Sequence, residues 1–176
     1  MKLYTNPAKE TWPQLTVRPQ LALEFLESSV RNILNRVKKS GDSALKELTL
    51  QFDKVSVQEL AVAEAEFIAA EKLLDPVLKN AIRTAAANIE KFHAAQRKDS
   101  VKIETTPGVT CWRKGVAIEK VGIYIPGGSA PLFSTVLMLG VPARLAGCKE
   151  VVLCSPPDSS GEINAAILFA ARLVGV

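Results

Sequence analysis

The chain has 176 residues, of which 48% are hydrophobic and 23% charged; this is ordinary for a globular protein and excludes a disordered or fibrous class. Its 22 basic residues exceed its 18 acidic residues by four, and they are spread along the chain. Proteins that bind nucleic acid usually concentrate basic residues on one face, so this charge does not indicate such a partner. The sequence holds one histidine, His93, so a mechanism that needs two cannot be completed within a single chain.

The three cysteines, Cys111, Cys148 and Cys154, are odd in number and form no C-x-x-C pair. We therefore expect neither a disulfide framework nor a thiolate zinc site, and we interpret Cys148 and Cys154 as small hydrophobes beside a strand. The first residues lack the apolar stretch of a signal peptide. No segment approaches the roughly 18 consecutive apolar residues of a membrane span. These features predict a soluble protein of the reducing cytoplasm.

Residues 1–100 predict a mainly helical region. Apolar residues recur at helical spacing from Val30 to Val37, and Gly41 then suits a left-handed C-terminal cap. Asp42 is expected to cap a second helix, whose apolar face extends to Phe52.

The longest predicted helix begins at Asp75-Pro76, a capping residue followed by a proline at the first helical position. Its apolar stripe continues to about Gln96 and is formed by Leu78, Ile82, Ala85, Ile89 and Phe92. His93 lies on or beside this stripe, with Glu90 as the nearby carboxylate. We interpret His93 as a hydrogen-bonded histidine at a helix-packing edge rather than as a proton carrier.

Residues 101–120 predict a β-hairpin and linker. Apolar and β-branched residues alternate with charged ones from Val101 to Thr105, and the alternation resumes after a turn at Pro107-Gly108. We interpret Trp112, in the second strand, as a residue that packs or covers a domain interface rather than as a platform on which a ligand stacks.

Residues 121–176 predict the first β-α-β-α unit of an incomplete Rossmann-like parallel sheet, so the fold class is α/β. The apolar runs at 121–125 and 151–154 are typical of strands buried on both faces of such a sheet. Each strand is followed by a predicted helix, at 132–146 and 163–173. A third strand is expected after Gly175, because two strands are too few for a stable open sheet. The domain is therefore expected to be incomplete at Val176.

The best candidate for a ligand site is the strand-to-helix turn from Tyr124 to Pro131, which contains Gly127, Gly128 and Ser129. Glycines allow the backbone to approach a ligand, free N–H groups at a helix start favour phosphate, and open α/β sheets bind ligands beyond the carboxyl ends of their strands. However, the turn is not G-x-G-x-x-G, and no Walker lysine follows it. On spacing alone, a plain tight turn remains favoured over a phosphate or dinucleotide site.

The stretch VGIYIPGGSAPLFSTVLM at 121–138 resembles the signature of the histidinol dehydrogenases, and the resemblance extends through 142–157. Residues 41–53 and 88–96 are similar to the family's N-terminal and long-helix motifs. The family oxidises L-histidinol to L-histidine, the last step of histidine biosynthesis, with two NAD in succession. Its members use zinc to hold the substrate and a glutamate–histidine pair as acid and base, and they work as homodimers.

Few functional residues carry over from the resemblance to this chain. Tyr124 matches the family's NAD-contacting tyrosine, and Gly127, Gly128 and Ser129 are expected to line the same cofactor cleft. The family's zinc ligands and catalytic pair lie downstream of the matched region, so no catalytic or metal-binding residue is predicted here.

The resemblance therefore implies the N-terminal part of a zinc- and NAD-dependent homodimeric oxidoreductase, inactive as an isolated chain, with no nucleic-acid or membrane partner. The alternative is a non-catalytic nucleotide- or phosphate-binding module derived from that enzyme.

Overall fold

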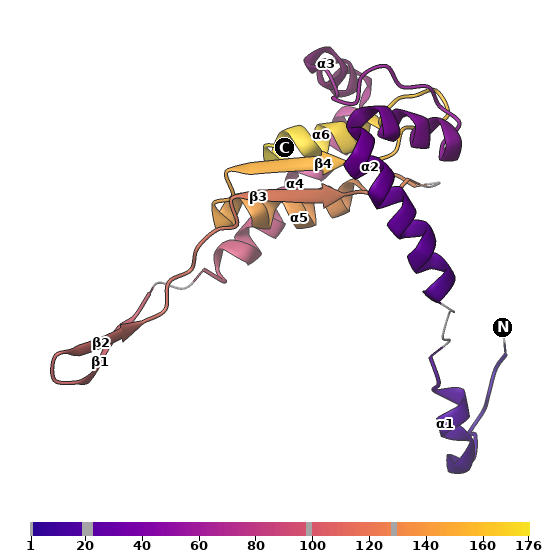
Figure 1. Ribbon diagram of the computed structural model, residues 1–176. Helices are drawn as coiled ribbons and strands as arrows, with labels where there is room; N and C mark the ends of the chain where they lie inside the picture. The colour runs from indigo at the N-terminus through magenta and orange to yellow at the C-terminus, as the bar shows by residue number, and fades with distance from the viewer. Residues whose placement is uncertain (1, 19–22, 98–99, 128–129) are drawn as a thin grey trace. The chain divides into compact units, whose positions relative to one another are not determined.

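The computed structural model describes residues 2–18, 23–97, 100–127 and 130–176 (Figure 1). The chain forms two compact units, Met1–Ala44 and Leu45–Val176. The predicted division into regions 1–100, 101–120 and 121–176 does not follow these units and stays a prediction. None of the helices in the described ranges has the length and apolar character needed to cross a bilayer.

The first unit is helical. A 3-10 turn at Lys9–Thr11 leads into α1 (Trp12–Leu15), and the indole of Trp12 donates a hydrogen bond to the Pro7 carbonyl at 3.1 Å. Helix α2 (Leu23–Phe52) begins in this unit and is interrupted at Gly41, where φ is 54° and ψ is −132°. Side chains rarely tolerate positive φ, so glycine permits the break. The predicted helix boundary at Gly41 is confirmed.

Two further helices precede the strands. Helix α3 (Glu64–Leu73) is followed directly by α4 (Pro76–Ala94), which starts where the sequence predicts. The carboxylate of Asp75 accepts a hydrogen bond from the Val77 N–H at 2.6 Å and so caps the first turn of α4. Ile82, on the predicted stripe, is buried, as is Ala86 beside it, whereas Phe92 at the end of the stripe is exposed.

The predicted hairpin is also present. Strands β1 (Lys102–Thr106) and β2 (Val109–Trp112) pair antiparallel, and every residue in them is exposed. The side chain of Trp112 is packed against no core of the described residues: its ring lies 5.7 Å from the Lys102 ammonium. Packing of Trp112 is therefore wrong for the described part of the chain, and the alternative that it covers a domain interface stays a prediction.

The second half of the chain forms the predicted β-α-β-α unit. Strands β3 (Lys120–Tyr124) and β4 (Glu150–Cys154) are parallel, with these terminal residues opposite one another. Helix α5 (Phe133–Ala146) connects the strands, and α6 (Ala165–Val174) follows β4. The mixed α/β class is confirmed.

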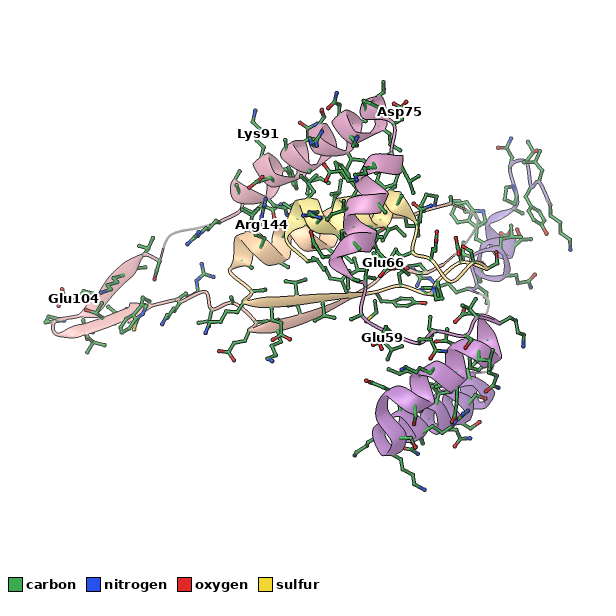
Figure 2. All side chains as sticks on the ribbon, turned by 90° about the horizontal axis from the view of Figure 1, so that it is seen from above. Glu59, Glu66, Asp75, Lys91, Glu104 and Arg144 are labelled. Carbon is green, nitrogen blue, oxygen red and sulfur yellow. The ribbon has the colours of Figure 1, made fainter. Side chains whose placement is uncertain are left out.

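One face of this sheet is covered and the other is not. Ile123 and Ile125 belong to a core shared with α4, α5 and α6, and Val151 and Leu153 pack against it; Figure 2 shows the helices on one side of the strands. Alternate residues face away from that core and are exposed, and we call them the open face: Lys120, Gly122, Tyr124, Glu150, Val152 and Cys154. The prediction that both faces are buried is therefore wrong for the described residues. An apolar run indicates that both faces of a strand can be buried, but it does not show which helices or strands cover each face.

Helices α5 and α6 pack unusually closely. A Cβ atom placed on Gly140 would lie 2.5 Å from Cγ2 of Val174, so a side chain at Gly140 would collide with α6. This contact, together with the buried Leu137 and Phe169, fixes the two helices under the covered face and thereby positions the loops that lead into them.

Candidate functional site

A cleft of about 160 Å³ lies at the carboxyl ends of β3 and β4, where the loops after the two strands meet. Its walls include Gly127 and Pro131 on one side and Pro156, Asp158 and Glu162 on the other. Pockets for whole drug-sized ligands measure roughly 300–1,000 Å³. The cleft therefore has room for part of a dinucleotide, such as a phosphate or a ribose.

Gly127 allows the two loops to approach. A Cβ atom on Gly127 would lie 2.9 Å from Cγ of Pro156, closer than real Cβ atoms come to another carbon. The glycine is thus required by packing between the loops. It is also the predicted loop residue that the structure shows in the cleft, whereas Gly128 and Ser129 lie outside the described residues.

Tyr124, the last residue of β3, stands on the open face rather than in the wall of the cleft. Its side chain is 63% exposed, and Cys154 lies opposite it on β4. The chain turns after Tyr124 through Ile125, whose N–H donates to the Cys154 carbonyl at 2.9 Å. Tyr124 therefore lies two positions before Pro126, the first residue that lines the cleft, and at the same end of the sheet.

The start of α6 lines the cleft through Asn164 and Ile167, and Pro131 lines it two residues before α5. Asn164 caps α6 by accepting a hydrogen bond from the Ala166 N–H at 2.9 Å. The residue before α5, Leu132, provides no side-chain cap from within the described residues. Unpaired N–H groups at a helix start attract anionic groups. The α5 end of the cleft can therefore donate backbone hydrogen bonds to a ligand.

Asp158 shapes the loop after β4. Its Oδ1 atom accepts hydrogen bonds from the hydroxyl and N–H of Ser160, at 2.6 and 2.8 Å, and from the Glu162 N–H at 3.1 Å. These hydrogen bonds, that of the Ser160 hydroxyl above all, hold the pKa of the Asp158 carboxyl below its ordinary value. Asp158 thus stays ionised, and its loop is held by its own side chain.

The charges at the cleft are negative. Asp158 and Glu162 are the charged side chains among the described lining residues, and the sequence has no Lys or Arg between Lys120 and Arg144 or between Glu150 and Arg172. A phosphate bound here would be held by backbone N–H groups, while the carboxylates suit hydroxyl groups as hydrogen-bond acceptors.

The residues of the second wall were not singled out from the sequence. Pro156 lies within the stretch that resembles the family, but the sequence predicts no role in the site for it, for Asp158 or for Glu162. Their position in the chain was a usable signal. The segment after β4 follows a parallel strand next to β3, and the carboxyl ends of neighbouring parallel strands meet at one edge of a sheet.

His93, near the C-terminal end of α4, does not line this cleft, and its ring is held by neighbouring side chains. Its Nδ1 atom is 3.0 Å from Oε1 of Gln96, and its ring meets that of Phe92 edge-on at 5.3 Å. Glu90, the carboxylate considered as a partner, pairs instead with Arg144 on α5 at 3.0 Å. This arrangement agrees with the structural interpretation of His93.

The cysteines divide between exposed and half-buried positions. Cys148 is half-buried, but Cys111 and Cys154 are exposed, and all three thiols are free. The strand that contains Cys154 was predicted to be buried on both faces, which is wrong at this residue: Cys154 belongs to the open face. Among the described residues, no three His, Cys, Asp or Glu side chains come together in a way that could hold a metal ion. The described residues therefore do not fit a zinc site.

The parallel strands, the helix on the connecting crossover and a cleft beyond the strand ends define a protein of the Rossmann-like α/β class. A family model described as histidinol dehydrogenase matches residues 16–176. The histidinol dehydrogenase of Bacteroides fragilis is 56% identical over all 176 residues, which are 41% of its own length. That of Xylella fastidiosa is 51% identical over 162 residues, covering 92% of this chain and 38% of the relative.

The solved structures include a close match. The crystal structure of histidinol dehydrogenase from Elizabethkingia anophelis superposes with a TM-score of 0.92 at 51% identity, over 98% of this chain and 40% of that one. The chain belongs to the histidinol dehydrogenase family. It spans about two-fifths of the length of the relatives that it matches.

Proposed function

We propose that the chain is the N-terminal part of a histidinol dehydrogenase, an oxidoreductase of histidine biosynthesis that converts L-histidinol to L-histidine with two NAD. The observation that carries the proposal is the cleft between Gly127 and Pro156, in a chain 56% identical to the Bacteroides fragilis enzyme. The enzyme is expected in the cytoplasm, consistent with three free cysteines, and as a homodimer.

The role of this part is to bind and orient NAD. The bound cofactor supplies the hydride acceptor. The α5 end of the cleft donates backbone N–H groups to a phosphate, and the carboxylates of Asp158 and Glu162 accept hydrogen bonds from hydroxyl groups. The exposed ring of Tyr124 lies beside these loops and offers a surface on which a flat ring can stack.

The chemical step is assigned to residues outside this chain. The described residues offer no metal cluster, and His93 is engaged with Gln96 away from the cleft. We therefore expect zinc, its ligands and the acid–base pair to come from the remaining length of a family member, and the 176-residue chain to bind NAD without oxidising histidinol.

Calorimetric titration of the chain with NAD tests this assignment. Tyr124→Ala should weaken binding, because it removes the exposed ring beside the cleft. Tyr4→Ala, which removes an exposed ring in the first unit, serves as the control and should leave the affinity unchanged. Equal affinities of the two variants, or no heat of binding at millimolar NAD, would reject the cofactor site proposed here.

A further inference from the structure

Two carboxylates stand on one wall of the cleft without a cation beside them. Asp158 and Glu162 line the cleft, and both residues are exposed. Among the described residues neither forms an ion pair, and no Lys or Arg occurs in the described lining. The described part of the protein therefore leaves both negative charges unneutralised, and they act on any group that enters the cleft.

The two residues are held together by their backbones and by one side chain. The N–H of Asp158 donates to the Glu162 carbonyl at 2.9 Å, and the N–H of Glu162 donates to Oδ1 of Asp158 at 3.1 Å. Between them, the Gly161 N–H donates to the Asp158 carbonyl at 3.0 Å. These hydrogen bonds close a tight turn that keeps Glu162 beside Asp158, so the two charges stay on the same wall.

The two carboxylates differ in what they can still accept. Oδ1 of Asp158 already accepts hydrogen bonds from the hydroxyl and N–H of Ser160 and from the Glu162 N–H. No described residue donates to the side chain of Glu162, so both of its oxygens are available to a ligand. An ionised carboxylate accepts hydrogen bonds but donates none. Glu162 therefore suits a ligand hydroxyl, whereas a phosphate finds neither a donor nor a positive charge in these two side chains.

The place of this wall in the fold indicates which hydroxyl is bound. Asp158 and Glu162 follow β4, the second strand of the β3–α5–β4 unit. In dinucleotide-binding folds, an acidic residue farther along such a unit accepts a hydrogen bond from the ribose 2′-hydroxyl of NAD, whereas an Arg accommodates the 2′-phosphate of NADP. That phosphate carries a charge of about −1.5 to −2 near neutral pH. The two carboxylates would repel it.

We infer that Glu162, held in place by Asp158, makes the cleft select a dinucleotide with a free ribose 2′-hydroxyl over one with a 2′-phosphate. Glu162 accepts the hydrogen bond of the hydroxyl. Asp158 is a positioning residue that holds the Glu162 backbone and adds a second negative charge. The inference rests on the proposed function and deepens it, because it names the residues that reject the phosphorylated form of the cofactor.

Calorimetric titration of the 176-residue chain with NAD and, separately, with NADP tests the inference. NADP should bind at least about tenfold more weakly than NAD, since its extra phosphate meets two carboxylates. Glu162→Gln keeps an acceptor oxygen and removes one charge, so it should reduce this ratio severalfold, mainly by tightening the binding of NADP. Glu59→Gln removes the same charge from an exposed residue that does not line the cleft, and it should leave the ratio unchanged.

Salt separates charge repulsion from a steric effect. The screening length falls from about 30 Å at about 0.01 M salt to about 3 Å at about 1 M. The ratio of the two affinities should therefore become smaller as salt is added to the unchanged chain, and it should depend less on salt in Glu162→Gln. A ratio that does not change with salt would assign the rejection of NADP to the width of the cleft and overturn the role of the carboxylates.

Two variants test the positioning role of Asp158. Asp158→Ala removes the acceptor of the Glu162 N–H and should weaken the binding of NAD severalfold. Asp158→Asn keeps an acceptor oxygen and should restore most of the affinity for NAD. An equal loss of affinity in both variants would overturn the positioning role, because the charge alone would then matter.

The outcomes keep the inference apart from the proposed function. If NAD and NADP bind equally, or if Glu162→Gln leaves the ratio of their affinities unchanged, the inference is wrong while the cofactor site stands. If neither dinucleotide binds at millimolar concentration, the cofactor site is rejected, and the inference falls with it.

Discussion

At the scale of single residues, the cleft depends on two unlike devices. Gly127 is needed because it has no side chain, so the loops after β3 and β4 come within contact at Pro156. Asp158 is needed for its charge, because one of its carboxylate oxygens accepts hydrogen bonds from N–H and hydroxyl groups of its own loop. The first device sets the width of the cleft and the second fixes the shape of one wall.

Gly127→Val should open the cleft and weaken NAD binding by at least about tenfold, equal to roughly 1.4 kcal/mol. The new Cβ would lie 2.9 Å from the Pro156 ring, so one loop must move. Gly115→Val is the matched control, since a Cβ there meets nothing within 4 Å. Calorimetric titration of both variants decides, and equal affinities would show that the loop spacing does not matter for the cofactor.

Lowering the pH should loosen the Asp158 loop. The pKa of Asp158 is lower in the folded chain than its ordinary value of 3.8, chiefly because the Ser160 hydroxyl donates to it. The ionised carboxyl therefore stabilises the folded loop fully above pH 3.8, the ordinary pKa of the group. This stabilisation is lost as the pH falls through the lower pKa of the folded chain. NMR should find the carboxyl titrating below 3.8, with the Ser160 and Glu162 amide signals shifting in step. In Asp158→Asn these amide shifts should disappear; their persistence would assign them to another group.

At the scale of elements, most of the fold follows from local patterns. Asp75, Gly41 and Gly147 act as helix boundaries because caps depend on neighbouring residues alone. The hairpin and both parallel strands also lie where alternation and apolar runs predict them. The open face and the second wall of the cleft could not be predicted in this way. The open face depends on which elements cover Val152, and the second wall depends on which loops meet at the end of the sheet. Neither property can be predicted from the residues of one segment alone.

Gly140→Ala should destabilise the second unit by about 1–3 kcal/mol, because overpacking forces α5 and α6 apart. The added methyl group would lie 2.5 Å from Val174. Gly122→Ala is the control: its Cβ meets nothing within 4 Å on the open face. Urea unfolding midpoints should fall for Gly140→Ala only. A fall of equal size in both variants would contradict helix packing as the cause.

Asp75→Ala should cost about 1 kcal/mol of stability, because the Val77 N–H loses its acceptor at the start of α4. Asp75→Asn keeps an acceptor oxygen and should retain most of that stability. Urea unfolding of the two variants measures the difference. If Asn destabilises as much as Ala, the charge of Asp75 rather than its hydrogen bond stabilises the helix start.

At the scale of the whole molecule, the chain presents a cleft that we propose to bind NAD, and its described residues form no metal cluster. The cleft, the capped helices and the close α5–α6 packing are complete within residues 45–176, whereas the sheet face and the β4 edge are open. The chain covers 41% of the length of the Bacteroides fragilis relative. Binding of the cofactor and chemistry on the substrate are thus assigned to different parts of the family's sequence.

The formation of NADH from L-histidinol, followed by absorbance, tests this account most directly. We expect no NADH from the 176-residue chain at any concentration of histidinol. We expect steady formation of NADH from a chimaera that joins Val176 to the part of the Bacteroides fragilis relative beyond its matched residues. Formation of NADH by the 176-residue chain alone would contradict the account, because the catalytic groups would then have to lie among the residues described here.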